Sequence, residues 1–185
     1  FLRNEINSEM ENLGFEQRWA VIDVILKRKK KDLPDRTIQY CSQFRPATYC
    51  RNVGKRRRWE IALKDNESSN TFFKEKSLWK FLSRWVTPDD VHIERKTIYK
   101  FQSAIAKKWR KGRIFLVGDA AHLTPPFMGQ GMCAGIRDAS NLAWKISISC
   151  QKGHNEQLLD TYQSERVSNV RDYIKTAMKM GELLN

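Results

Sequence analysis

The sequence lacks any long apolar run, and it shows no secretory signal. No stretch approaches the roughly 20 apolar residues that span a bilayer, and the first residues lack the pattern of a signal peptide. These absences predict a cytoplasmic protein without a membrane partner. With 185 residues, 41% of them hydrophobic, and six tryptophans, the chain can form one large or two small folded domains.

Cysteine and histidine are also scarce. The four cysteines show neither C-x-x-C nor metal-ligand spacing, so free thiols in a reducing compartment are expected. The three histidines lie too far apart in the sequence to indicate a metal site, and no metal is expected. These residues are Cys41, Cys50, Cys133, Cys150, His92, His122 and His154.

Acidic residues are few beside basic ones. The 34 Lys and Arg residues against 21 Asp and Glu residues give a formal net charge of +13. Basic residues cluster at 27–31, 55–58 and 107–113, and the first cluster reads most simply as a solvated hairpin end. The alternative is long-range attraction of anions, including NAD(P)H and a carboxylate substrate. No nucleic-acid-binding signature accompanies the charge, so nucleic acid is not expected as a partner. Nothing in the sequence indicates an oligomeric state.

The strand and helix signals change near residue 112. Before it, β-branched and aromatic residues predict strands, with one helix that ends before Thr87-Pro88. After it, the order is strand, helix, helix, with Gly153 between the helices. The expected fold class is α/β (α+β), with an antiparallel sheet first. The expected strands are 19–26, 37–44, 58–63 and 91–101, and the first helix is 77–85. The last helix, 158–184, should bury Val167, Val170, Ile174 and Ala177.

Residues 112–143 carry most of the information about function. The uninterrupted apolar run 114–117 suits a strand buried on both faces. This run stops at Gly118-Asp119, a small residue followed by a carboxylate. In open α/β sheets, the carboxyl ends of the strands are where ligands bind. The segment therefore predicts a ligand site at Gly118-Asp119, although an ordinary strand-to-helix connection with a helix-capping aspartate is the alternative.

A stiff loop and a glycine-rich helix start follow. The loop holds Pro125 and Pro126, and Gly129-Gln130-Gly131 opens the helix. The N–H groups at a helix start are unpaired and carry the positive end of the helix dipole, and glycines let backbone approach a ligand closely. The helix should bury one apolar face, made of Met132, Ile136, Ala139, Ala143, Ile146 and Cys150.

This segment closely resembles the Gly-Asp motif region of the class A flavoprotein aromatic hydroxylases, the para-hydroxybenzoate hydroxylase-like FAD-dependent monooxygenases. The motif reads Gly-Asp-Ala-Ala-His, then Pro-Pro, then Gly-Gln-Gly-Met. Within that group the chain is most similar to the 3-(3-hydroxyphenyl)propanoate hydroxylases. The resemblance covers nearly the whole chain, because further family signatures occur in family order at 11–15, 38–41, 56–60, 85–90 and 159–162.

The resemblance implies two structural parts. Residues 1–111 correspond to the substrate domain, an antiparallel sheet with an inserted helix. Residues 112–185 correspond to the C-terminal part of a Rossmann-like FAD-binding domain. The family's G-x-G-x-x-G and middle Asp-Gly motif are absent, as is its C-terminal domain. The spacing from Gly129 through Gly131 to Gly135 does not match the missing fingerprint. The chain is therefore expected to be a fragment that lacks the ADP half of the FAD site and is inactive alone.

The resemblance also assigns roles in holding FAD. An ionised aspartate only accepts hydrogen bonds, so Asp119 suits a hydroxyl of the ribityl chain. The helix-start N–H groups would stabilise negative charge on the reduced flavin, and the two prolines would shape the side where oxygen reacts. We call the expected cofactor-binding residues the Gly-Asp cradle: Gly118, Asp119, Pro125, Pro126, Gly129, Gln130, Gly131 and Met132.

The implied activity is hydroxylation of a phenolic aromatic acid, such as a 3-(3-hydroxyphenyl)propanoate-like compound, with FAD, NAD(P)H and O2. No catalytic residue can be assigned. Tyr40, Tyr49 and Arg58 are candidates for facing the small aromatic substrate, with sheet packing or a surface salt bridge as the favoured alternative. Arg137-Asp138 is expected as an ion pair within the helix. Other readings are an epoxidase or polyketide hydroxylase of the same fold, or a non-catalytic fragment.

Overall fold

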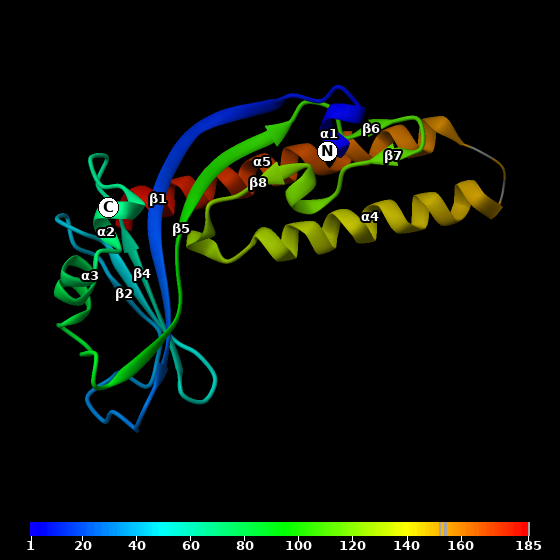
Figure 1. Cartoon of the computed structure of the whole chain (residues 1–185). Coiled ribbons are helices and arrows are strands. Elements are labelled where there is room, and N and C mark those ends of the chain that lie inside the picture. The colour runs from blue at the N-terminus through cyan, green and yellow to red at the C-terminus, as the bar shows by residue number, and fades with distance from the viewer. Residues whose placement is uncertain (152, 154, 185) are drawn as a thin grey trace. The chain divides into compact units, whose positions relative to one another are not determined.

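The computed structural model describes residues 1–151, 153 and 155–184. The chain forms two compact units. The first unit combines Phe1–Glu16 with Phe101–Leu183, and the second is built from Gln17–Lys100. Strands β1 (Met10–Leu26) and β5 (Val91–Ala106) each pass from one unit into the other (Figure 1). These compact units differ from the ranges 1–111 and 112–185 expected from the sequence, because residues 1–16 and 101–111 group with the C-terminal helices. The assignment of those ranges to a substrate domain and an FAD-binding domain stays a prediction.

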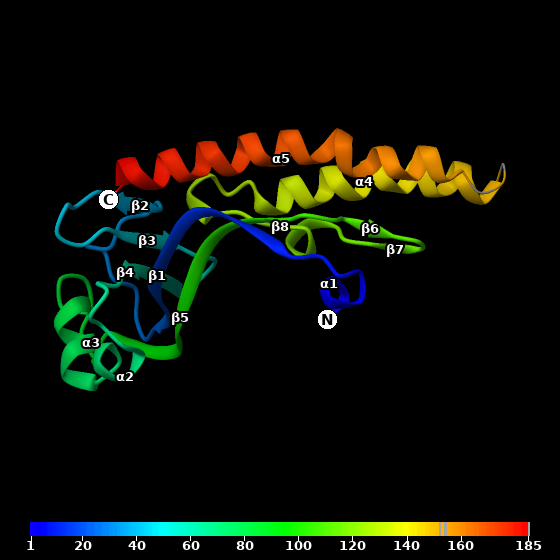
Figure 2. The same cartoon turned by 90° about the horizontal axis from the view of Figure 1, so that it is seen from above.

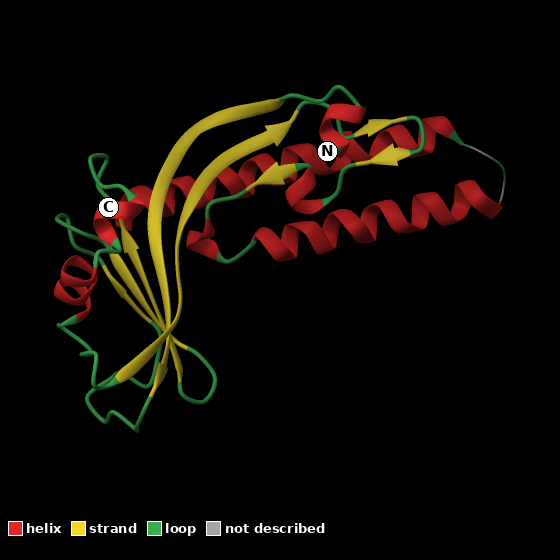
Figure 3. Ribbon diagram, viewed as in Figure 1, coloured by secondary structure: helices red, strands yellow, loops and turns green. Residues whose placement is uncertain are grey.

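The second unit is an antiparallel sheet with helices on one face (Figure 3). Side chains alternate between the faces of a strand, and the register places Tyr49 and Ile22 opposite Trp59 on its two neighbouring strands. All three are buried in one core, together with Leu78 and Leu82 of the covering helix. With parts of β1 and β5, the elements are β2 (Ile38–Tyr40), β3 (Ala47–Arg51), β4 (Arg56–Ala62), α2 (Ser69–Phe72) and α3 (Glu75–Leu82).

The elements predicted for this unit are confirmed, but their bounds differ. The four expected strands and the helix are present, but β1 begins at Met10 and β5 continues to Ala106. The strand expected at 37–44 ends at Tyr40, because the polar segment before Pro46 leaves the sheet. Strand β3 was not expected, since its five residues mix small, polar and charged side chains.

The first unit packs two long helices against short strands and turns (Figure 2). Helix α5 buries Val170, Ile174 and Ala177, with Val167 half-buried beside them, so its predicted stripe is confirmed. None of the helices in the described part of the chain is long and apolar enough to cross a bilayer. The elements are α1 (Leu2–Glu5), β6 (Arg110–Lys111), β7 (Ile114–Phe115), η1 (Gly118–Ala120), β8 (His122–Leu123), η2 (Pro126–Met128), α4 (Gly131–Gln151) and α5 (Glu156–Leu184).

Two expectations about this unit are wrong within the chain. The strand expected at 114–117 comprises only Ile114–Phe115, is half-buried, and pairs antiparallel with β6. The apolar stripe expected to be buried on α4 is exposed, with Met132 at 75% and Ile136 at 59% of full exposure. The face of α4 that is buried instead carries Ala134, Asp138, Leu142, Lys145 and Ser149. A hydropathy pattern misses this face because the charged residues on it are buried together with partners.

Candidate functional site

The Gly-Asp turn is a one-turn 3-10 helix that packs directly on α4. Gly118 begins it at φ 57°, a left-handed conformation that favours glycine. A Cβ on Gly118 would lie 3.4 Å from the Gly135 Cα, and a Cβ on Gly135 would lie 3.3 Å from the Gly118 Cα. The two glycines therefore let the turn and the helix meet backbone to backbone.

The Asp119 carboxylate is available to a ligand. It is exposed, and within the described part of the chain it makes no hydrogen bond or ion pair. Its backbone is held instead, because Arg3 Nη2 donates to the Asp119 carbonyl at 3.1 Å and Arg3 Nε donates to the Ala120 carbonyl at 2.8 Å. Asp119 thus presents an acceptor on a turn whose main chain is fixed from the other side.

The loop after the turn leaves room beside its glycines. The η2 turn closes with Gly129 at φ 62°, whose N–H donates to the Pro126 carbonyl at 2.9 Å. A Cβ at Gly129 or at Gly131 would meet no atom within 4 Å. The N–H groups of the first turn of α4 point out of this helix end. Open space beside glycine backbone, next to N–H donors, is suited to a flat ligand that carries negative charge.

An aromatic side chain anchors this loop. The Phe127 ring lies edge-on to the Phe15 ring, with centroids 5.7 Å apart. It also fills the space beside Gly181 of α5, where a Cβ would come within 2.5 Å of the Phe127 ring. The proline loop is therefore held by packing, and Gly181 is required for that packing.

Three buried polar residues beneath the turn were not expected from the sequence. Asp138 is fully buried and contacts His122 and Arg166, both buried. The expected Arg137–Asp138 ion pair is wrong, because the Arg137 guanidinium lies over the Tyr173 ring, 5.4 Å from its centroid. Neighbours in a helix sequence point in different directions. Only the long-range pairing with β8 and α5 explains a buried aspartate here.

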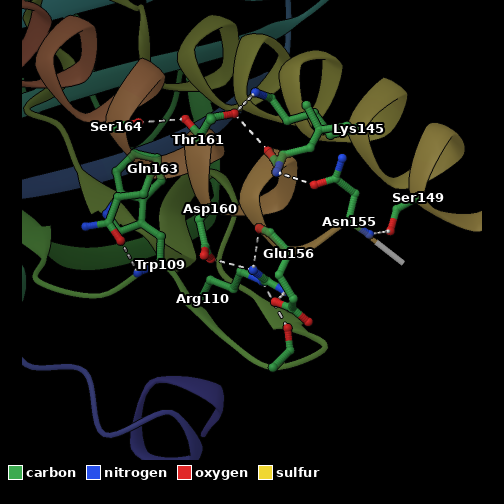
Figure 4. Close-up of polar contacts among 12 residues, drawn as sticks. Trp109, Arg110, Lys145, Ser149, Asn155, Glu156, Asp160, Thr161, Gln163 and Ser164 are labelled. Atoms are coloured by element: carbon green, nitrogen blue, oxygen red, sulfur yellow. Dashed lines mark hydrogen bonds and ion pairs between the residues drawn. The ribbon is translucent and has the colours of Figure 1, made fainter. Parts of the chain in front are cut away.

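A second polar cluster joins α4, β6 and the start of α5 (Figure 4). Arg110 forms ion pairs with Glu156 and Asp160. Lys145, fully buried, donates to the Thr161 hydroxyl and to Glu165 Oε1, the latter at 2.7 Å. Hydrogen bonds from Asn141 and Lys145 lower the pKa of Glu165 to about 2. Within the described part of the chain, the hydrogen bonds and ion pairs of this cluster join the two long helices and β6 and do not reach the Gly-Asp turn.

The three substrate-facing candidates do not lie on one face of the sheet. Tyr49 is fully buried on the helix-covered face, where its hydroxyl donates to the Pro34 carbonyl at 3.1 Å. Tyr40 shares that face and is half-buried. Its hydroxyl accepts a hydrogen bond from Trp85 Nε1 at 3.1 Å, and its ring lines a hollow of about 210 Å³ that Arg45 and Trp85 also border.

Arg58 belongs to a polar row on the opposite face. Its Nε donates to Asp23 Oδ1 at 2.6 Å, and Arg95 Nε donates to Asp23 Oδ2 at 2.8 Å. Burial raises the pKa of the neighbouring Cys50 thiol to about 11, and it also raises the pKa of the Glu60 carboxyl. Arg58 is thus already paired, and this row places two arginines around one buried carboxylate.

The fold agrees with what the chain is similar to. The profile of a family described as FAD binding domain matches residues 2–177. The chain belongs to this family. A probable NADH-specific resorcinol 4-hydroxylase of Rhodococcus jostii (strain RHA1) is 38% identical over 98% of the chain and 34% of the relative. A 3-(3-hydroxy-phenyl)propionate/3-hydroxycinnamic acid hydroxylase of Escherichia coli O8 (strain IAI1) is 31% identical over 100% of the chain and 33% of the relative.

Solved structures with the same fold include a hydroxylase and a monooxygenase. Aklavinone-11 hydroxylase, in a complex with FAD and aklavinone, superposes with a TM-score of 0.84 at 22% identity, over 97% of this chain and 35% of that one. The p-nitrophenol 4-monooxygenase of Pseudomonas putida DLL-E4 gives 0.77 at 22% identity, over 96% of this chain and 47% of that one. The expected fold class is confirmed. The chain spans about a third of the length of the curated relatives it matches.

Proposed function

We propose that the protein to which this chain belongs is an FAD-dependent monooxygenase that hydroxylates a phenolic aromatic acid with NAD(P)H and O2. Membership of the FAD-binding family supports the cofactor. The names of two relatives, a resorcinol hydroxylase and a hydroxyphenylpropionate hydroxylase, support a phenolic ring as the substrate class. The first of these names also supports a nicotinamide as the electron donor.

The observation that carries the proposal is the exposed Asp119 carboxylate, which has no partner among the described residues and lies beside open glycine backbone. In the proposed role, Asp119 accepts a hydrogen bond from a ribityl hydroxyl of FAD. The first-turn N–H groups of α4 would stabilise negative charge on the flavin, and Pro125 and Pro126 would help to hold its ring. When bound, FAD supplies the redox chemistry and activates oxygen. The chain's own residues bind it, orient it and exclude water.

Tyr40 and Arg58 remain the proposed substrate contacts, with different strengths. The Tyr40 hydroxyl accepts from Trp85, so its own proton is free to be donated to a ligand. Arg58 can meet a substrate carboxylate only by sharing its guanidinium with Asp23. The burial of Tyr49 in the core favours a packing role for that residue.

Titration of the apoprotein with FAD tests the proposal. In the full-length protein, Asp119→Ala should weaken FAD binding by about 1.5–3 kcal/mol, the contribution of a hydrogen bond to a charged group. Asp172→Ala is the matched control, because Asp172 is an exposed aspartate of the same unit. If the Asp119→Ala protein binds FAD as tightly as the control does, Asp119 is not part of the FAD site.

A further inference from the structure

The Asp138 carboxylate joins four elements of the first unit. Its Oδ2 accepts from the Gly118 N–H at 3.2 Å and from His122 Nε2 at 2.6 Å. Its Oδ1 accepts from Arg166 Nε at 2.8 Å. One side chain of α4 therefore holds the first residue of the Gly-Asp turn, β8 and α5 together.

This carboxylate is kept ionised although it is buried. Asp138 and His122 are both 0% exposed, and Arg166 is 8% exposed. Burial opposes ionisation of Asp138, but hydrogen bonds from His122 and Arg166 outweigh it and lower the pKa of the carboxyl. A carboxylate only accepts, so His122 Nε2 carries the proton that it shares. Three donors from three different elements therefore surround this buried carboxylate.

The donors come from different places in the chain, and only one of them is part of the proposed cofactor site. Gly118 lies immediately before Asp119, and its backbone N–H donates to Asp138. On the other side of the turn, Arg3 holds the Asp119 and Ala120 carbonyls. The turn is thus fixed at the residues before and after the Asp119 side chain, while that side chain is left exposed.

We propose that Asp138 is a positioning residue for the cofactor site: its carboxylate fixes the Gly118 N–H and so sets the direction of the Asp119 carboxylate. His122 and Arg166 serve as the counter-groups that make a buried Asp138 possible. This inference rests on the proposed function only in its last link, from the turn to the flavin. The first link, from Asp138 to the turn, is a property of the chain itself.

Hydrogen exchange of the full-length apoprotein tests the first link. In Asp138→Asn, an NH2 group replaces one carboxylate oxygen and faces either Arg166 or the Gly118 N–H, both of which are donors, so the turn should loosen. Exchange in the peptide 116–121 should rise about ten-fold, as expected for loss of one charge-assisted hydrogen bond. The matched control is Glu165→Gln, which breaks the other ion pair between α4 and α5 and should change this peptide less than two-fold.

FAD titration of the same variants tests the second link. Asp138→Asn should weaken FAD binding about ten-fold more than Glu165→Gln does. Equal exchange in peptide 116–121 for the two variants would overturn the positioning role. Increased exchange without weaker FAD binding would also overturn it, and it would show in addition that the turn does not hold the flavin. If Asp119→Ala alone weakens FAD binding, the proposed function stands and the positioning role fails.

A second variant covers the case in which Asp138→Asn does not fold, as judged by circular dichroism. Arg166→Gln keeps the Asp138 side chain but removes its charged partner, so the buried carboxylate is no longer held toward Gly118 from the α5 side. Exchange in peptide 116–121 should still rise more than in Glu165→Gln. A change no larger than in that control would overturn the proposal.

Discussion

The two units of the chain bury different kinds of side chain. Residues 17–100 hold 21 Lys and Arg residues against 10 Asp and Glu residues, which is +11 of the chain's net +13. Yet among the residues whose burial is described, the buried polar ones of this unit are Asp23 and Asp90. The first unit is nearly neutral, and it buries His122, Asp138, Lys145 and Arg166. Charge is thus carried on the surface of one unit and built into the interior of the other.

The difference shows what each kind of core requires. In the second unit, alternation along the strands places apolar rings under α3, and any apolar side chain of similar volume serves the same purpose. In the first unit, each buried charge depends on a particular partner distant in sequence. Such an interior specifies geometry as well as stability, and the proposed cofactor turn lies directly on it.

The largest expected effect tests the apolar core of the second unit. Trp59→Ala removes a fully buried ring between Tyr49 and Trp85 and should lower the free energy of unfolding by about 3–5 kcal/mol. Phe44→Ala is the control, because that ring is 80% exposed and its loss should change stability by less than about 0.5 kcal/mol. Urea unfolding followed by circular dichroism measures both. Similar values for the two variants would contradict the core described for this unit.

The sequence predicts the elements that bury apolar side chains better than those that bury charges. The strands at 19–26 and 58–63 were predicted from β-rich composition or alternation, and the strand at 91–101 from side chains of one parity. The buried stripe of α5 was predicted from helical spacing. The burial of α4 was predicted on the wrong face, since its buried positions include Asp138 and Lys145. A paired charge cannot be recognised as buried without its partner, and those partners lie 16 to 28 residues away.

The site was predicted in the same partial way. The Gly-Asp turn and the glycines of the helix start were expected from a local motif, and the structure shows an exposed carboxylate and open backbone there. Their assignment to FAD stays a prediction. Arg3 was missed because it lies more than 100 residues before the turn that it holds. No local pattern in the sequence could relate the two.

A middle-sized effect tests the charged interior of the first unit. Glu165→Gln leaves the buried Lys145 ammonium without its anionic partner and should lower the free energy of unfolding at pH 7 by about 1–3 kcal/mol. Lys145→Met is the informative comparison, because it removes the buried charge itself and often costs little or stabilises. If Lys145→Met lowers the free energy of unfolding more than Glu165→Gln does, the Lys145 ammonium stabilises the fold by more than its ion pair with Glu165.

The pH dependence of this pair has a definite sign. The Glu165 pKa is lowered from 4.5 to about 2 in the folded chain. A lowered folded-state pKa means that the stabilisation is present above about pH 4.5 and is lost as the pH falls toward 2. The stability difference between wild type and Glu165→Gln should therefore shrink over that interval. A difference that is constant from pH 7 to pH 3 would contradict the role of the ionised carboxylate.

The smallest expected effect tests which face of α4 is buried. Ile136 is 59% exposed and Leu142 is 5% exposed, although the hydropathy pattern of α4 favours Ile136 as the buried residue. In the 185-residue chain, Ile136→Gln should change the free energy of unfolding by less than about 0.5 kcal/mol and should lower the fluorescence of the apolar dye ANS. Leu142→Ala, the control on the buried face, should cost about 2–5 kcal/mol. Both values come from urea unfolding. The opposite ranking would mean that α4 turns its apolar stripe inward, and the contacts of Asp138 with the Gly-Asp turn could then not form.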